Sequence, residues 1–155
     1  RATIPDDPEA IGEVAVRGPN VFAGYLGKDD ALEDGWFYTG DLATRVDGQI
    51  RIVGRRSTDI IKCGGFKVGA GEVEAALLEH PAIAEAAVIG EPDPDLGERI
   101  VAFVVVRTSV EPKAIEDHVA GLLSPHKRPR VVHVIDALPR NAMGKVQKTQ
   151  LRGAR

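Results

Sequence analysis

The sequence predicts an α+β fold, in which a β-rich first third is followed by a small mixed domain. Two observations lead to this prediction. Short apolar segments separated by Gly- and Pro-containing turns fill residues 1–57, whereas helical patterns and β-branched strands alternate from residue 58 onward. We therefore expect a β-rich piece at 1–57 and, at 58–155, an α+β domain with a short β-sheet flanked by helices.

The β-rich piece contains one strong hairpin signal. Asp47-Gly48 is a favourable two-residue turn between strands expected at 42–46 and 49–53. Further strands are expected at 13–17, which alternates polar and apolar residues, and from Trp36 onward. A short helical turn at 29–33 is the only helix we expect in this piece.

The mixed domain is predicted to contain two main helices. Apolar residues recur at helical spacing over 71–80, which Pro81 stops, and over 112–123, which begins with a proline in its first turn. A short helix at the end of the chain is also possible. Strands are expected at 59–62, 66–68, 84–89, 100–106 and 130–135, with turn-rich loops at 91–97 and 125–129.

Composition excludes several classes of function. The net charge is −3. Residues 124–155 contain eight basic residues and a single acid, Asp136, but few aromatic residues lie among them. We therefore expect no nucleic-acid partner; the basic end would either meet a phosphate ligand or be a solvated surface. No apolar run approaches the roughly 20 residues that span a bilayer, so no membrane partner is expected.

Cysteine and histidine usage argue against a redox or metal centre. The lone Cys63 allows no intrachain disulfide, which fits a cytoplasmic protein, and no base lies near it in sequence to make it a nucleophile. The four histidines lack metal-ligand spacing, so no metal site is predicted. The chain begins with Arg1, and we expect it to be a piece of a longer protein.

Three short motifs follow one another at wide spacing: Tyr38-Thr39-Gly40-Asp41, then Gly54-Arg55, then Gly144-Lys145. Each is weak alone, but their order and spacing resemble the C-terminal part of the adenylate-forming superfamily, which comprises acyl-CoA synthetases, luciferases and peptide-synthetase adenylation domains. The resemblance covers residues 12–152. It implies the end of a large N-terminal domain at 1–57, a mobile C-terminal domain at 58–155 and a hinge near 56–59.

The resemblance assigns a nucleotide site to the first two motifs. Asp41 would hold the ribose hydroxyls of ATP and AMP, and Arg55 would be a second nucleotide contact, with Tyr38 and Thr39 beside them. A carboxylate accepts two hydrogen bonds from adjacent hydroxyls, and a guanidinium pairs with phosphate. Without the resemblance, Asp41 reads as a turn aspartate and Arg55 as a surface arginine.

Two segments between the motifs also resemble functional parts of the superfamily. The hinge would be Ser57 or Thr58, and the sequence does not choose between them. Residues 62–67 resemble the loop that lines the pantetheine tunnel of acyl-CoA synthetases, which implies that Lys62, Gly64, Gly65, Phe66 and Lys67 bind CoA. An ordinary Gly-Gly hairpin turn explains the same residues equally well.

By resemblance, Lys145 is the catalytic lysine of adenylation. Attack of a carboxylate on the α-phosphate of ATP gathers negative charge, which an ammonium group stabilises. The resemblance also makes Lys145 a target of a lysine acetyltransferase, which would remove that charge. The alternative is an ordinary lysine in a basic tail.

Within the superfamily, segments such as 64–74 and 90–99 are most similar to malonyl-CoA synthetases. The implied reaction is carboxylate plus ATP giving acyl-AMP, then CoA giving acyl-CoA and AMP, with Mg²⁺ accompanying ATP. The parent protein is thus expected to be an AMP-forming acid–thiol ligase of fatty acid metabolism, and this chain alone to be inactive. The alternatives are another acyl- or aryl-CoA ligase, or a domain that serves as an acetyltransferase substrate.

Overall fold

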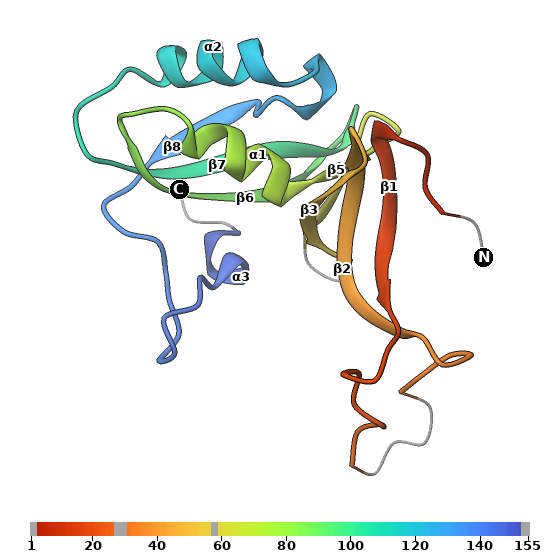
Figure 1. The fold of residues 1–155 in the computed structure, drawn as a ribbon. Helices are drawn as coiled ribbons and strands as arrows, with labels where there is room; N and C mark the ends of the chain where they lie inside the picture. Colours follow the sequence, from red (N-terminus) through yellow and green to blue (C-terminus); the bar gives the residue numbers. More distant parts are fainter. Residues whose placement is uncertain (1–2, 27–30, 57–58, 153–155) are drawn as a thin grey trace. The chain divides into compact units, whose positions relative to one another are not determined.

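The computed structural model describes residues 3–26, 31–56 and 59–152. The chain forms two compact units, Arg1–Thr58 and Asp59–Arg155. The expected α+β fold is confirmed: one antiparallel sheet and one mixed sheet are accompanied by few helices (Figure 1).

The first unit is a three-stranded antiparallel sheet in the order β1-β2-β3, formed by Asp7–Val16, Phe37–Val46 and Gln49–Arg55. The predicted hairpin is confirmed: Val46 pairs with Gln49, and Asp47 (φ 51°) and Gly48 (φ 75°) occupy the left-handed region that this turn requires. The helical turn expected at 29–33 is wrong where the structure describes it. Glu33 and Trp36 instead exchange two backbone hydrogen bonds of 2.9 and 3.0 Å, while residues 29–30 lie outside the described range.

The second unit is built on a five-stranded sheet in which β7 is central. Its strands are β4 (Ile60–Cys63), β5 (Phe66–Gly69), β6 (Ile83–Asp93), β7 (Gly97–Val106) and β8 (Val131–Val134). β6 and β4 pair antiparallel with β7, and β8 pairs parallel with it. The loop expected at 91–97 is shorter than predicted, because β6 and β7 stay paired as far as Asp93 and Gly97.

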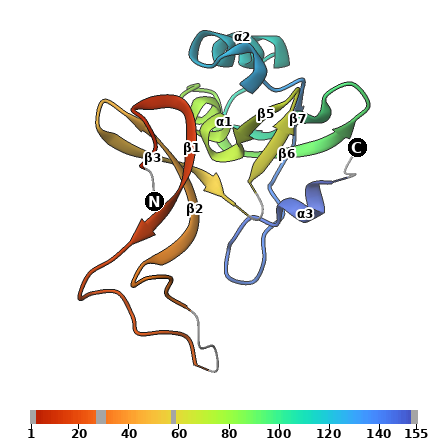
Figure 2. The ribbon, with the colours of Figure 1, turned by 90° about the vertical axis from the view of Figure 1, so that its right-hand side faces the viewer.

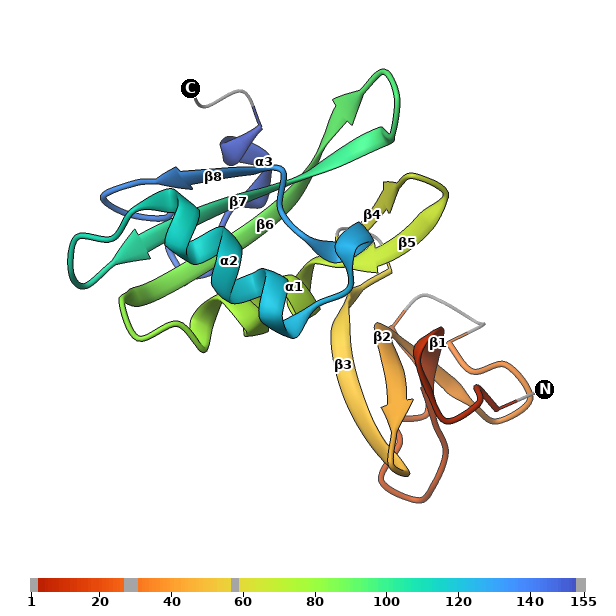
Figure 3. The same cartoon turned by 90° about the horizontal axis from the view of Figure 1, so that it is seen from above.

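Both faces of this sheet are covered, because β7 is apolar on both sides. Ile100, Ala102 and Val104 pack against α1 (Ala70–Leu78) and α2 (Pro112–Leu122), while Val101 and Phe103 pack against Leu138 and Leu151. Figure 3 shows α1 and α2 on the near side of the strands and α3 (Lys148–Leu151) on the far side. The last segment of the chain is thus part of a core layer.

Local sequence explains the ends of the helices. Pro112 lies in the first turn of α2, where a missing N–H costs nothing, and α1 ends at Leu78 shortly before Pro81. The segment expected as a loop at 125–129 contains a short 3₁₀ turn, η1 (Pro125–Lys127). None of the helices within the described ranges is long and apolar enough to cross a membrane.

Candidate functional site

The structure brings Asp41 and Arg55 together in the first unit. They are cross-strand partners on β2 and β3, and the Arg55 Nε lies 2.8 Å from the Asp41 Oδ1. Both side chains keep solvent access, with 61% of Arg55 and 33% of Asp41 exposed. The carboxylate and the guanidinium therefore form one polar patch that faces solvent.

Thr39 and Gly40 shape the backbone below this patch. The Thr39 hydroxyl donates to the Val14 carbonyl at 3.1 Å and accepts the Asp41 N–H at 3.0 Å, while Gly40 takes a φ of 77°. The Gly40 N–H donates to Glu13 at 3.1 Å, and Glu13 also accepts from the Arg56 guanidinium at 3.0 Å. Thr39 thus supports Asp41 from below, and Glu13, which the sequence did not single out, ties Gly40 to Arg56.

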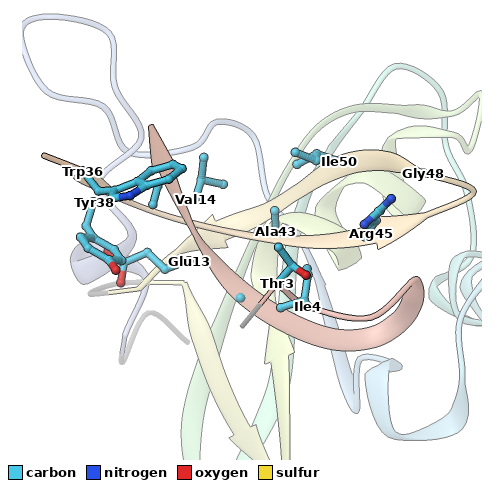
Figure 4. A pocket seen from close by; sticks show the side chains of 12 residues that line it. Thr3, Ile4, Glu13, Val14, Trp36, Tyr38, Ala43, Arg45, Gly48 and Ile50 are labelled. Atoms are coloured by element: carbon cyan, nitrogen blue, oxygen red, sulfur yellow. The ribbon is translucent and has the colours of Figure 1, made fainter. Parts of the chain in front are cut away.

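Tyr38 takes a different position: successive residues of a strand face opposite sides, and Tyr38 and Asp41 are three positions apart. It lines a mostly apolar hollow of about 690 Å³ over the first sheet. Figure 4 shows Tyr38 beside Trp36 and Glu13 at one end of this hollow, with Thr3 and Ile4 further along. Tyr38 thus shares a strand with Asp41 and lines a separate surface.

In the second unit, residues 62–67 form a tight hairpin. Cys63 pairs with Phe66, and Gly64 (φ 59°) and Gly65 (φ 85°) supply the two positive φ angles of its turn. Lys62 and Lys67 are direct cross-strand partners, so their side chains project from the same face, and both are exposed. Two like charges facing each other create a site that a phosphate can neutralise.

An aromatic pair stands beside this hairpin. Phe66 is half exposed, and its ring stacks on that of His126 with a centroid distance of 4.1 Å. His126 comes from η1, about 60 residues further along the chain, and the sequence analysis treated it only as a loop residue. The signal that could have found it is the proline on each side of 126–128, which fixes a rigid turn.

Cys63 is 3% exposed, and burial, the largest cause, raises the pKa of its thiol above the usual value. This protonated thiol is a poor nucleophile. Among the described residues, no three His, Cys, Asp or Glu side chains converge in a way that could hold a metal ion. Ser57 and Thr58, the two hinge candidates, lie outside the described residues.

Lys145 lies in a hairpin that backbone hydrogen bonds close. Figure 2 shows this segment of the chain leading into α3. Arg140 bridges to Val146, the Asn141 N–H donates to the Lys145 carbonyl at 2.9 Å, and the Asn141 Oδ1 accepts the N–H of Met143 at 3.0 Å and of Lys145 at 2.9 Å. Gly144 takes a φ of 79°. The lysine side chain is exposed on a backbone that side-chain hydrogen bonds hold in place.

Further contacts fix both ends of this segment. Arg140 donates to the Gly144 carbonyl at 2.6 Å and forms an ion pair with Glu85 on β6, and Leu138 is 5% exposed in the core. After the hairpin, Lys148 forms ion pairs with Asp59 and Glu74, and Leu151 is 3% exposed. Sequence reasoning singled out Lys145 as a candidate but none of the residues that hold its hairpin.

Comparison with known proteins defines the class. Residues 72–145 match the AMP-binding enzyme C-terminal domain, and the segment ends at Lys145. By sequence and by fold, the chain matches the C-terminal portion of the adenylate-forming enzymes.

The curated relatives are named as CoA ligases. Over 154 residues the chain is 43% identical to the human mitochondrial malonate–CoA ligase ACSF3, a match that covers 95% of this chain and 27% of the relative. The structure of the o-succinylbenzoate CoA synthetase MenE from Bacillus subtilis, in complex with the acyl-adenylate intermediate OSB-AMP, superimposes with a TM-score of 0.83 at 37% identity, covering 96% of this chain and 32% of that one.

A second solved structure, ATP-bound MatB from Rhodopseudomonas palustris, gives a TM-score of 0.75 at 39% identity and covers 92% of this chain and 30% of that one. The chain therefore spans about 27% of the length of the first curated relative and about a third or less of these solved structures. The resemblance read from the sequence motifs is confirmed at the level of the superfamily and of its CoA ligases.

Proposed function

We propose that the parent protein is an AMP-forming acyl-CoA ligase that activates malonate, and that this chain supplies its catalytic lysine and part of its nucleotide site. The observation that carries the proposal is the Lys145 hairpin, in which Asn141 fixes the backbone while the ammonium group stays free to reach a ligand. Malonate is proposed because the human relative, 43% identical, is a malonate–CoA ligase.

The reaction has two steps. In the first, a carboxylate oxygen attacks the α-phosphorus of ATP, the bond to the β-phosphate oxygen breaks, and pyrophosphate leaves. Lys145 stabilises the negative charge that gathers there, and Asp41 accepts hydrogen bonds from the ribose hydroxyls while Arg55 makes a further nucleotide contact. Mg²⁺ arrives with ATP, bound to its phosphate oxygens as part of the substrate.

In the second step, the CoA sulfur attacks the acyl carbon, the thiol proton is lost, and the bond to AMP breaks. We assign CoA binding to the 62–67 hairpin: Lys62 and Lys67 project from one face toward phosphates, and Gly64-Gly65 lets a thin pantetheine arm approach the backbone. The change between the two steps would use a hinge at Ser57 or Thr58, between a large N-terminal domain ending at 57 and a mobile domain at 58–155.

The test is AMP release from malonate, ATP, Mg²⁺ and CoA. The full-length protein should release AMP, its Lys145→Ala variant should lose acyl-adenylate formation, and this chain alone should be inactive. Lys113→Ala is the matched control, because Lys113 is 74% exposed and forms an ion pair with Asp117, which is 63% exposed. Full-rate acyl-adenylate formation by Lys145→Ala would refute the central assignment.

The acid is tested in the same assay with acetate and 2-succinylbenzoate. The structure bound to OSB-AMP has a TM-score of 0.83, against 0.75 for ATP-bound MatB, so the second candidate is a CoA ligase for an aryl or larger acid. Activity with 2-succinylbenzoate and none with malonate would leave the ligase assignment standing and change the proposed substrate.

Localisation is proposed as cytoplasmic, although the name of the human relative places that enzyme in mitochondria. Imaging of a tagged full-length protein tests this proposal.

Exposure of Lys145 also favours a regulatory role, in which a lysine acetyltransferase modifies it. Acetylation would neutralise the charge that adenylation requires. Mass spectrometry after incubation with a lysine acetyltransferase should find the modification at Lys145, with parallel loss of AMP release. Modification elsewhere with unchanged activity would rule this role out.

A further inference from the structure

Lys148, three residues after the proposed catalytic lysine, forms ion pairs with two carboxylates at once. Its Nζ lies 2.7 Å from the Asp59 Oδ1 and 2.8 Å from the Glu74 Oε1, and the three side chains are mostly buried, with 24%, 17% and 21% exposed. We propose that Lys148 is a positioning residue for adenylation, which holds the Lys145 hairpin to the first residue of the second unit.

The two carboxylates that receive Lys148 are themselves fixed. Asp59 is the first residue of the second unit, and its carbonyl accepts the Ala70 N–H at 2.7 Å, at the start of α1. Glu74 lies on α1, and its Oε1 also accepts the Val88 N–H of β6 at 2.8 Å. Lys148 therefore joins α3 to the beginning of the unit, to α1 and to the central sheet at one point.

This contact is one of the two supports of the hairpin. Arg140 and Leu138 fix the chain before Lys145. After it, the chain is fixed by Lys148, three residues beyond Lys145, and by Leu151, six residues beyond. The Lys148 ammonium forms an ion pair with both carboxylates. Without it, two partly buried negative charges would each lose an ion pair, which is unfavourable. We expect α3 to loosen and the hairpin to lose its second support.

The consequence for catalysis rests on the proposed role of Lys145. A group that must meet charge developing on a phosphate loses much of its effect when it is displaced by about 1 Å, and such a displacement costs up to about 100-fold in rate. Since Lys148 would act through Lys145, its removal should reduce adenylation and leave the attack of CoA on acyl-AMP unaffected.

The experiment uses the full-length ligase and measures the two half-reactions separately. Acid-dependent exchange of ATP with pyrophosphate reports adenylation, and release of AMP from preformed acyl-adenylate plus CoA reports thioester formation. The variants are Lys148→Met, Lys148→Arg, Lys145→Ala and the double variant Lys145→Ala/Lys148→Met. Lys113→Ala serves as the matched lysine control.

We expect Lys148→Met to lower the kcat of exchange by about 10–100-fold with a near-constant KM for ATP, and Lys148→Arg to recover most of it. In the Lys145→Ala background, Lys148→Met should cause no further loss. Equal loss of both half-reactions, or the same factor in both backgrounds, would show a general structural effect and overturn the proposal.

Hydrogen exchange separates this inference from the proposed function. In Lys148→Met, amides of 140–147 should exchange hydrogen faster while those of β6 and β7 keep their protection. Unchanged hydrogen exchange at 140–147 overturns the proposal. If Lys145→Ala adenylates at full rate, the proposed function fails. The hydrogen-exchange data still report whether Lys148 holds the hairpin. If Lys148→Met does not fold, Asp59→Asn, which leaves Lys148 paired with Glu74, should show the same changes at smaller amplitude, and their absence there counts equally against the inference.

Discussion

The Arg55 guanidinium lies 2.8 Å from the Asp41 carboxylate across two neighbouring strands, at the surface of the first unit. An ion pair this exposed contributes at most about 1 kcal/mol to stability, because solvent screens the charges and ordering the side chains costs entropy. Its removal should therefore affect ligand binding far more than folding, which allows the two roles to be separated.

The first prediction concerns Asp41. In the full-length protein, Asp41→Ala should raise the KM for ATP by about 10–100-fold, the effect of losing hydrogen bonds to a charged group. The melting temperature should stay within a few degrees. Asp117→Ala, which removes another exposed ion pair, is the control and should leave KM unchanged. An unchanged KM together with lowered stability would make Asp41 a structural turn residue.

The second prediction concerns the buried pair Lys127–Glu72. The Lys127 Nζ lies 3.1 Å from the Glu72 Oε1, and the side chains are 5% and 10% exposed. Lys127→Met should cost about 3–5 kcal/mol in the free energy of unfolding, because it leaves a buried charge unpaired. Urea unfolding measures this cost, and Lys113→Ala should stay within about 0.5 kcal/mol.

The double variant Lys127→Met/Glu72→Leu refines this second prediction. It removes both charges together, so most of the lost stability should return. If the double variant is as unstable as Lys127→Met alone, the cost comes from lost packing rather than from the unpaired carboxylate.

Local patterns predicted the local structure. The Asp47-Gly48 and Gly64-Gly65 turns, the β-branched run at 100–106 and the proline in the first turn of α2 each act within a few residues, so the sequence displays their effect directly. The β6–β7 turn was predicted too long, because the prolines and acids of 91–97 read as loop. In the structure the two strands remain paired through Pro92 and Glu98, where the register continues.

The residues that support the candidate site could not be predicted in this way. Lys148 meets Asp59 across 89 residues, and Lys127 meets Glu72 across 55, so no local periodicity connects either pair. Lys145 was singled out as a candidate because it lies in a short motif that resembles a known family. Asn141 lies within the same run, but its role depends on a side-chain acceptor that the folded hairpin places under two N–H groups.

The third prediction concerns Asn141. Asn141→Leu keeps the size of the side chain and removes the acceptor for the Met143 and Lys145 N–H groups, whereas Asn141→Asp keeps an acceptor. In the full-length enzyme, the Leu variant should lower the kcat of acid-dependent ATP–pyrophosphate exchange by about 10-fold or more, and the Asp variant should retain most of it. Full activity of the Asn141→Leu variant would show that this acceptor is dispensable.

The fourth prediction concerns the stacked rings of Phe66 and His126. If the 62–67 hairpin binds CoA, Phe66→Ala and His126→Ala should each raise the KM for CoA by about 2–10-fold, the range expected from lost aromatic contacts. Exchange of ATP with pyrophosphate should not change, because that step precedes CoA. Loss of exchange with a constant KM for CoA would instead favour the reading of residues 62–67 as an ordinary structural turn.

The fifth prediction concerns the pH range in which Lys148 stabilises the fold. Burial opposes its charge, but Coulombic attraction from Glu74 and hydrogen bonds with Asp59 and Glu74 outweigh that effect and raise the pKa of Lys148 above 10.5. A raised pKa in the folded state means that the contribution is complete below about pH 10.4, the unfolded value, and is lost as pH rises through the folded value. Urea unfolding of the full-length protein and of Lys148→Met should therefore differ by a constant amount from pH 7 to about 10, and the difference should shrink above that range. A difference that disappears already near pH 8 would contradict the ion contacts with Asp59 and Glu74 as the source of the stabilisation.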